Sequence, residues 1–226
     1  MGEKLPTLTS PIVPWNWPWI NVKKTKFNPD GEYTVDMVFD SEDHPFLKKV
    51  EGIMEDAYQG AIDVALESKQ LKPAKVKDVK TIVPWKAEED ADGNETGRII
   101  WPVKTKAVVK AKKTGKNVDI TVKVFDANLK DITSQKVKVG SGTKGRVSFS
   151  YKVMFVKITG NVHMVSYLNA VQIVELAEFG NSDGGAFGFG AEEGFSGADY
   201  VEPETKESSE EEEAVVGVNP DDDAAF

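Results

Sequence analysis

The 226-residue chain contains no cysteine and only two histidines. The missing cysteines exclude disulfides, thiolate zinc sites and cysteine nucleophiles. His44 and His163 stand far apart and show no metal-ligand or catalytic-triad spacing, so we expect both to be structural. No Gly-x-x-x-x-Gly-Lys phosphate-binding motif occurs either. We therefore expect a protein that is not an enzyme and needs no metal or other cofactor.

Long hydrophobic runs are also missing. No apolar stretch approaches the roughly 20 residues that a membrane span needs, and the first eleven residues lack the apolar segment of a secretory signal. We expect no membrane contact and a location in a reducing cytoplasm. The composition fits one globular domain, since 40% of the residues are hydrophobic.

Charge is divided unevenly along the chain. Residues 180–226 hold fourteen of the 37 acidic residues and one of the 28 basic residues, which leaves residues 1–179 with a net charge of +4. The sequence predicts a basic domain at 1–179, a flexible Gly-rich and acidic linker at 180–209 and an acidic tail at 210–226. Such a tail can compete with whatever polyanion the basic domain binds. Nucleic acid is the obvious candidate.

The domain is expected to be mainly β with one long helix. A turn at Asn28–Gly31 precedes an alternating strand over 33–39, and apolar residues then recur at helical spacing over 46–68, with an acidic opposite face. Four or five strands follow, the last of them, 162–179, bending near Asn169 and Ala170. This order predicts an OB-type, five-stranded and partly open barrel.

Basic residues concentrate in the second half of the domain. Residues 97–160 contain fifteen Lys or Arg and three acids, in a region that reads as strands over 98–112, 118–125 and 146–157. Alternation places Lys104, Lys106, Lys110 and Lys112 opposite a core face. In the next strand Val118, Ile120, Val122 and Val124 are expected to point inward and Phe125 outward. Tyr151 and Phe155 are core by the same rule, unless a β-bulge turns Phe155 and Lys157 outward.

Three tryptophans, Trp15, Trp17 and Trp19, alternate near the start, which in an extended strand would put all three rings on one side. Two interpretations stand: the rings cap the core, or they form a platform on which bases stack. The predicted DNA-binding set is Trp15, Trp17, Trp19, Lys23, Lys24, Lys26, Trp101, Lys104, Lys106, Lys110, Lys112, Lys123, Phe125, Lys144, Arg146, Lys152, Phe155 and Lys157.

The tail contains two acidic groups that predict separable roles. The first can screen the basic surface, whereas the second ends in an aromatic residue that suits a pocket on a partner protein. A merely solubilising tail is the alternative. The predicted autoinhibitory and partner-binding residues are Glu210, Glu211, Glu212, Glu213, Asp221, Asp222, Asp223 and Phe226.

Three segments resemble one family, the replication single-stranded DNA-binding proteins of short-tailed coliphages. They are Asn28–Met37 before the helix, Val174–Gly180 at the end of the domain, and the terminal Asp221–Phe226. The resemblance implies non-sequence-specific binding of single-stranded DNA in phage replication, recombination and repair, inside the bacterial host. It also implies an OB-fold body whose DNA site is shielded by an acidic tail that contacts a replicative polymerase or helicase.

Other partners stay open at this point. Duplex DNA could bind more weakly to the same basic face, and a second copy of the chain could form a homodimer. Two alternative functions are a duplex-DNA-binding protein and a protein-interaction scaffold whose lysines are only solubilising.

Overall fold

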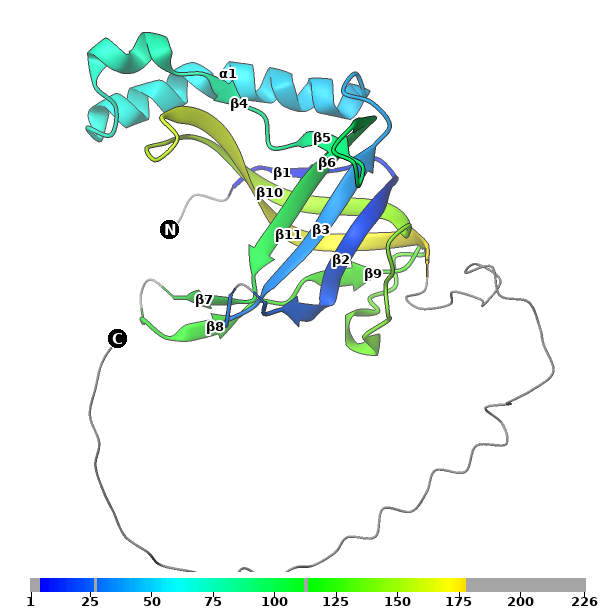
Figure 1. The fold of residues 1–226 in the computed structure, drawn as a ribbon. Helices are drawn as coiled ribbons and strands as arrows, with labels where there is room; N and C mark the ends of the chain where they lie inside the picture. Colours follow the sequence, from blue (N-terminus) through cyan, green and yellow to red (C-terminus); the bar gives the residue numbers. More distant parts are fainter. Residues whose placement is uncertain (1–4, 27, 112–113, 178–226) are drawn as a thin grey trace, which may run out of the picture. The chain divides into compact units, whose positions relative to one another are not determined.

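The computed structural model describes residues 5–26, 28–111 and 114–177 (Figure 1). The predicted domain boundaries and the acidic tail lie outside these residues. The elements are β1 (Thr7–Thr9), β2 (Val13–Lys24), β3 (Glu32–Phe39), α1 (Pro45–Glu67), the 3₁₀ helix η1 (Pro73–Asp78), β4 (Thr81–Ile82), β5 (Lys86–Glu89), β6 (Glu95–Lys106), β7 (Val108–Lys110), β8 (Asn117–Asp119), β9 (Lys123–Phe125), the 3₁₀ helix η2 (Thr133–Gln135), β10 (Lys144–Val156) and β11 (Asn161–Glu175).

Five strands close into a ring in the order β2, β3, β6, β11, β10 and back to β2. Two of the contacts in this ring are short. β6 meets β11 in parallel at the single pair Lys104 and Tyr167, and β10 meets β2 at Lys144 with Pro14 and Gly145 with Val13. The ring confirms the predicted OB-like barrel.

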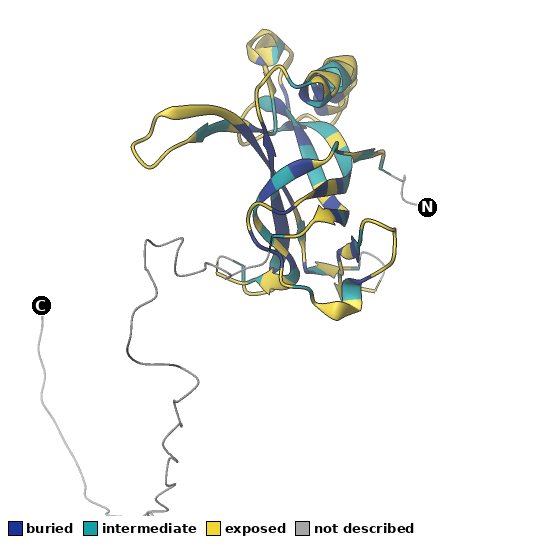
Figure 2. Cartoon of the chain, turned by 90° about the vertical axis from the view of Figure 1, so that its right-hand side faces the viewer, coloured by how far each residue is buried: buried dark blue, intermediate teal, exposed yellow. Residues whose placement is uncertain are grey.

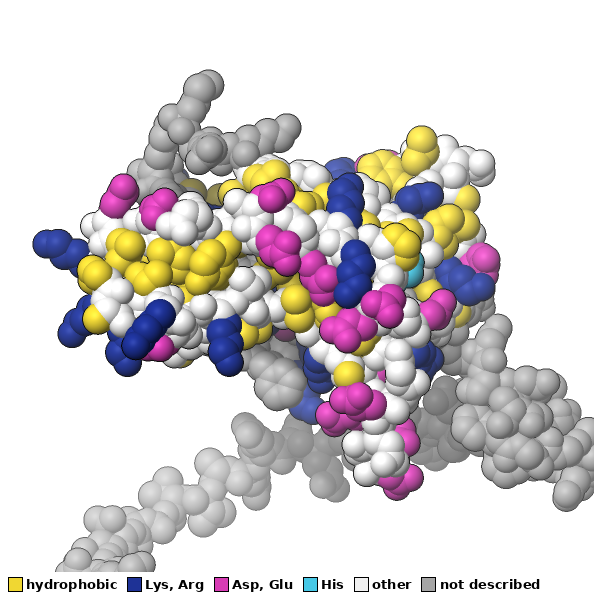
Figure 3. Space-filling view, turned by 90° about the horizontal axis from the view of Figure 1, so that it is seen from above, with side chains coloured by type: hydrophobic (Ala, Val, Ile, Leu, Met, Phe, Trp, Pro, Cys, Tyr) yellow, Lys and Arg dark blue, Asp and Glu magenta, His cyan; other side chains and the backbone are white. Residues whose placement is uncertain are grey.

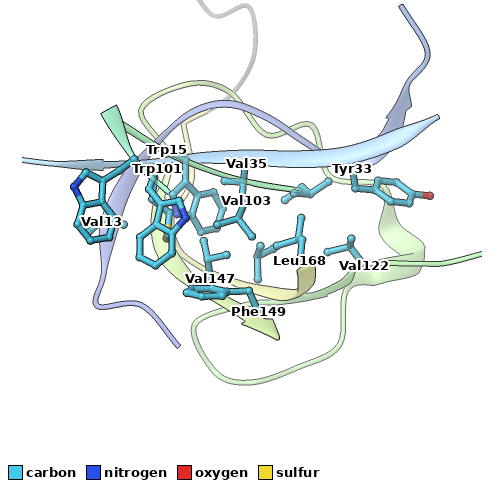
Figure 4. Close-up of a cluster of buried hydrophobic side chains, with 14 of the residues drawn as sticks. Val13, Trp15, Tyr33, Val35, Trp101, Val103, Val122, Val147, Phe149 and Leu168 are labelled. Carbon is cyan, nitrogen blue, oxygen red and sulfur yellow. The ribbon is translucent and has the colours of Figure 1, made fainter. Parts of the chain in front are cut away.

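Large aromatic side chains fill the barrel (Figure 4). Trp101 packs edge-on against Phe149, with ring centroids 5.1 Å apart, and it contacts Trp85 at 5.3 Å. Trp15 is buried in the same cluster. Figure 2 shows the resulting pattern of buried strands inside and exposed loops outside.

Helix α1 covers one end of the barrel and confirms the helix expected over 46–68. Pro45 occupies its first turn, where a missing N–H costs nothing, and Nδ1 of His44 accepts a hydrogen bond from the Phe46 N–H at 3.1 Å. This cap gives His44 the structural role that the sequence predicted. The first half of α1 packs on the barrel core through Leu47, Val50 and Met54.

The second half of α1 packs on the β10–β11 hairpin, which extends beyond the barrel. Ala61, Ile62 and Ala65 form a second cluster there with Val162 and Phe155. Phe155 is 5% exposed, so the alternation predicted for β10 holds at this position and no bulge turns the ring outward. The placement of Phe155 on a DNA-contacting outer face of β10 is therefore wrong, because its ring packs against α1.

Two strands predicted as continuous are interrupted: 98–112 is broken at Ala107, and 118–125 is broken at residues 120–122. The Ala107 N–H donates to the Gly31 carbonyl, the Ile120 N–H donates to the Ala107 carbonyl, and the chain then forms the separate β7–β8 hairpin. Val118, predicted to point inward, is 44% exposed because this two-stranded sheet has no part in the barrel core. Lys112 lies outside the described residues.

The predicted bend in the last strand is confirmed. Ser148 pairs with Ala170 while Phe149 pairs with Leu168, so Asn169 is the extra residue of a β-bulge. The Asn169 side chain donates to Ser150 Oγ at 2.8 Å across the bulge. The bend lets β11 contact β6 and β9 along one edge.

Gly145→Ala should destabilise the protein by about 1–3 kcal/mol, because overpacking a filled core forces the backbone to shift. A Cβ at Gly145 would lie 2.6 Å from Cζ2 of Trp15 and would also overlap the Gln172 carbonyl oxygen. Urea unfolding measures the change. Gly52→Ala, within α1 and with no atom within 4 Å of the added Cβ, is the matched control and should stabilise by about 0.5–1 kcal/mol. A Gly145→Ala protein as stable as wild type would contradict this account of barrel closure.

Candidate nucleic-acid interface

The three early tryptophans do not share a face, contrary to the prediction. Trp15 is 0% exposed, Trp17 is 65% exposed and Trp19 is 40% exposed. Trp17 has φ of +48°, and the β2–β3 register shifts between Asn16 and Trp19, so the simple alternation of an extended strand is lost. Trp15 belongs to the core and is removed from the predicted DNA-binding set.

Strand register brings two exposed aromatic residues onto one surface. Trp19 pairs with Thr34, Thr34 with Lys104, and Lys104 with Tyr167, which is 41% exposed. We call these four residues the aromatic row. Because adjacent strands lie about 4.8 Å apart, the row spans roughly 14 Å between its two aromatic ends. It provides two ring faces with an ammonium group between them.

A second row lies one step nearer the end of the barrel that carries β7 and β8. Lys24 pairs with Glu32, and Glu32 pairs with Lys106. The Glu32 carboxylate is 3.9 Å from Nζ of Lys104, so it forms an ion pair with the lysine of the aromatic row. Lys23 forms a similar ion pair with Asp119, at 3.6 Å. Phosphate groups would compete with these carboxylates for exposed lysines.

Carboxylates border the opposite side of the aromatic row. The next row is Asn16, Asp36 and Pro102, and partial burial raises the pKa of Asp36 while Lys24 and Lys86 lower it in part. Beyond it the β5–β6 hairpin projects with Asp and Glu side chains gathered on it (Figure 3). Glu88 of this hairpin pairs with Arg98. A polyanion is therefore favoured on the lysine side of the row.

Other predicted contacts lie elsewhere. Trp101 is in the core, so its inclusion in the DNA-binding set is wrong. The β9–β11–β10 register aligns Phe125, Gln172 and Arg146 in a separate outer row, and the Arg146 guanidinium donates to the Ser10 carbonyl at 3.2 Å. The remaining predicted lysines are spread over several elements: Lys26 after β2, Lys110 on β7, Lys123 on β9, Lys144 at the start of β10, and Lys152 and Lys157 on or beside the far part of β10.

Tyr167 is the residue that sequence reasoning missed. Along β11 the residues Val162, Met164 and Leu168 are buried, so Tyr167 stands in the outward register. The same alternation that singled out Phe125 could have found it. Its place beside Lys104, however, depends on a parallel contact between strands more than 60 residues apart.

Among residues 5–26, 28–111 and 114–177 no group of three His, Asp or Glu side chains is placed to hold a metal ion. No helix in this part of the chain is long and apolar enough to cross a membrane. The tail residues predicted to screen the basic surface lie outside the described residues.

Asp131 offers a pH test of the local structure around Lys123. The side chain and N–H of Thr133, together with Lys123 at 3.1 Å, lower the pKa of Asp131 from 3.8 to about 2. A depressed carboxyl pKa contributes stability above the unfolded pKa that is lost as pH falls toward the folded pKa. Asp131→Asn should therefore lower the urea midpoint at neutral pH, and the difference from wild type should narrow between pH 3.8 and about 2. A difference that stays constant over this range would exclude the carboxylate as the cause.

The described surface can be compared with known proteins. The family model for "Single-stranded DNA-binding protein, Bacteriophage T7" matches residues 16–176, which include the aromatic row and the five barrel strands except for the first three residues of β2. Two curated relatives carry the name single-stranded DNA-binding protein. The one from Enterobacteria phage T3 is 28% identical over 203 residues, covering 88% of this chain and 85% of its own length.

The relative from Escherichia phage T7 is 26% identical over 159 residues, covering 69% of this chain and 67% of its own. Among solved structures, gp2.5, a single-stranded DNA binding protein encoded by bacteriophage T7, superposes with a TM-score of 0.61 at 21% identity, covering 85% of this chain and 99% of that chain. This last similarity supports the fold, and the family match extends over most of the chain. The chain belongs to the bacteriophage T7 family of single-stranded DNA-binding proteins.

Proposed function

We propose that this protein binds single-stranded DNA without sequence specificity during phage DNA replication and recombination, and that the aromatic row is the centre of its site. Bases would stack on Trp19 and Tyr167, and backbone phosphates would contact Lys104 and Lys106. The observation that carries the proposal is the register that places two exposed rings on either side of Lys104.

Lack of sequence specificity follows from the chemistry of this surface. Every base has a π-face, so stacking on an aromatic ring is tolerant of sequence. Lysine contacts the phosphate backbone as a point charge and carries no base information. Duplex DNA keeps its bases paired and stacked, so only its phosphates could use this surface. We therefore expect weaker binding to duplex.

We also propose that the acidic tail acts on this interaction. Together with the linker it holds fourteen acidic residues and one basic residue, over residues 180–226, which makes it a tethered polyanion that competes with DNA for the basic surface. A second role is recruitment, in which Phe226 enters a pocket on a replicative polymerase or helicase and Asp221–Asp223 engage basic residues around it. The two acidic groups would then separate screening from recruitment.

Trp19→Ala and Tyr167→Ala should each weaken binding to oligo-dT by about 1–3 kcal/mol, the usual contribution of one stacked base. Fluorescence anisotropy with labelled oligo-dT measures the affinity. Val64→Ala, an exposed side chain on the second half of α1 and outside the aromatic row, is the control and should bind as wild type does. Unchanged affinity in both aromatic variants would place the site elsewhere. Equal affinity of wild type for blunt duplex would favour a duplex-binding protein.

Removing residues 210–226 should tighten binding to single-stranded DNA, most strongly at low salt where the tail's charge is least screened. Titration of oligo-dT against the full chain and the truncated chain at two salt concentrations tests this. Phe226→Ala serves as the matched control because it keeps all tail charges, so its DNA affinity should equal that of the full chain. Equal affinity of full and truncated chains would leave the tail without an autoinhibitory role.

A further inference from the structure

Five lysines and a single acid lie in the short stretch from 69 to 80, which the aromatic row does not use. The stretch comprises the residues that follow α1, then η1 and the approach to β4. The turn of the β10–β11 hairpin lies beside it, since the Lys80 N–H donates to Asn161 Oδ1 at 2.9 Å and the Val162 N–H donates to the Lys80 carbonyl. This turn adds Lys157, and the outer face of β10 adds Lys152. We call these residues the lysine end: Lys69, Lys72, Lys75, Lys77, Lys80, Lys152 and Lys157.

The lysine end differs in its charge balance from several lysines on the strands. Lys23, Lys104, Lys123 and Lys144 each face a carboxylate within 4.0 Å. Within the described part of the chain, none of the seven lysines at this end forms an ion pair, and all seven are exposed. Figure 3 shows Lys and Arg side chains gathered at the end of the molecule where α1 finishes. Uncompensated positive charge of this density attracts a polyanion.

A pocket of about 380 Å³ lies at the centre of the lysine end, between η1 and the β10–β11 turn. Its buried apolar side chains are Leu71 and Phe155. Polar groups surround them, namely Lys72, Lys75, Thr159 and Asn161, with Asp78 as the one carboxylate. The volume falls within the roughly 300–1,000 Å³ usual for ligand sites. An apolar floor with an ammonium rim suits a nucleobase and its adjoining phosphates.

The pocket and the aromatic row lie on the same strand. β11 meets β6 at Tyr167 and meets β4 at Val162 and His163, so both contacts use one edge of β11. Tyr167 is six positions after Asn161, which corresponds to roughly 20 Å along a strand. Lys152, opposite Val165, lies between the two sites. A strand of DNA leaving the aromatic row at Tyr167 along the hairpin would therefore pass Lys152 before it reaches the lysine end.

We propose that the lysine end is a second subsite for single-stranded DNA, in which the pocket receives one nucleotide and the surrounding lysines contact the backbone. The inference rests on the proposed function and adds a direction to it: bound DNA runs from Trp19 past Tyr167 along the β10–β11 hairpin. Oligonucleotides long enough to span both sites engage both, and short ones engage only the aromatic row.

The test compares oligo-dT of about 8 nucleotides with oligo-dT of about 30 nucleotides. The shorter length falls within the roughly 4–16 nucleotides that an OB fold covers, and the longer one exceeds it. In the full chain, Lys72→Gln with Lys75→Gln should weaken binding of the long oligonucleotide about five- to tenfold and reduce the slope of log K against log salt by about 1.4, or about 0.7 per lost phosphate contact. Binding of the short oligonucleotide should not change. Lys48→Gln with Lys49→Gln, which removes two charges from the start of α1, is the matched control and should leave both affinities unchanged.

Three results would overturn the subsite. The first is an unchanged affinity for the long oligonucleotide, and the second is an equal loss for both lengths, which indicates a general charge effect. The third is tighter binding by the Lys72 and Lys75 variant in the full chain only, with no effect after removal of residues 210–226, which would make this end a docking surface for the tail. Trp19→Ala distinguishes failure of the proposed function, since it should weaken binding of the short oligonucleotide, which the Lys72 and Lys75 variant leaves unchanged.

Discussion

Barrel closure depends on one close approach, in which the ring of Trp15 and the Gln172 backbone lie against the bare backbone of Gly145. The seam there has only two paired residues on each strand, and the seam between β6 and β11 has one. So few backbone hydrogen bonds cannot fix the ring by themselves. Packing of Trp15, Trp101 and Phe149 inside the barrel supplies the remainder, because large aromatic rings bury much apolar area per residue. A side chain at Gly145 would push β2 and β11 away from β10 at this seam.

The functional surface is a consequence of that closure. Only when the ring is shut does β11 lie beside β6, and only then does Tyr167 stand next to Lys104. The aromatic row is therefore assembled from four strands that come from both halves of the domain. Carboxylates of Asp36 and the β5–β6 hairpin border it on one side, and lysines border it on the other. This polarity gives a bound polyanion one favourable side at the aromatic row, whereas the unpaired lysines at the η1 end lie toward the other end of β11.

Strand alternation predicted much of the core and failed where the backbone departs from a regular strand. Val122, Val124 and Phe155 were expected inside and are buried. The errors coincide with irregularities: the positive φ of Trp17 separates Trp17 and Trp19 from Trp15, and the turn at Ala107 exposes Val118. At Asn169 an irregularity was itself predicted. The last strand was too long to stay regular, so a bend was expected there, and the bulge confirms it. Alternation has period two, so each inserted residue reverses every later assignment.

The sequence by itself determined the chain's class: its basic domain, its acidic tail, one helix among strands, and a family resemblance that the family match confirms. These properties reside in composition and local periodicity, which need no knowledge of distant contacts. Only the tertiary structure decided which aromatic residues are exposed together. Trp19 and Tyr167 are separated by nearly 150 residues, and their shared surface depends on register across three strand pairs. Register is set by closure of the barrel around its core. Closure depends on packing between distant segments and is not encoded in any one of them.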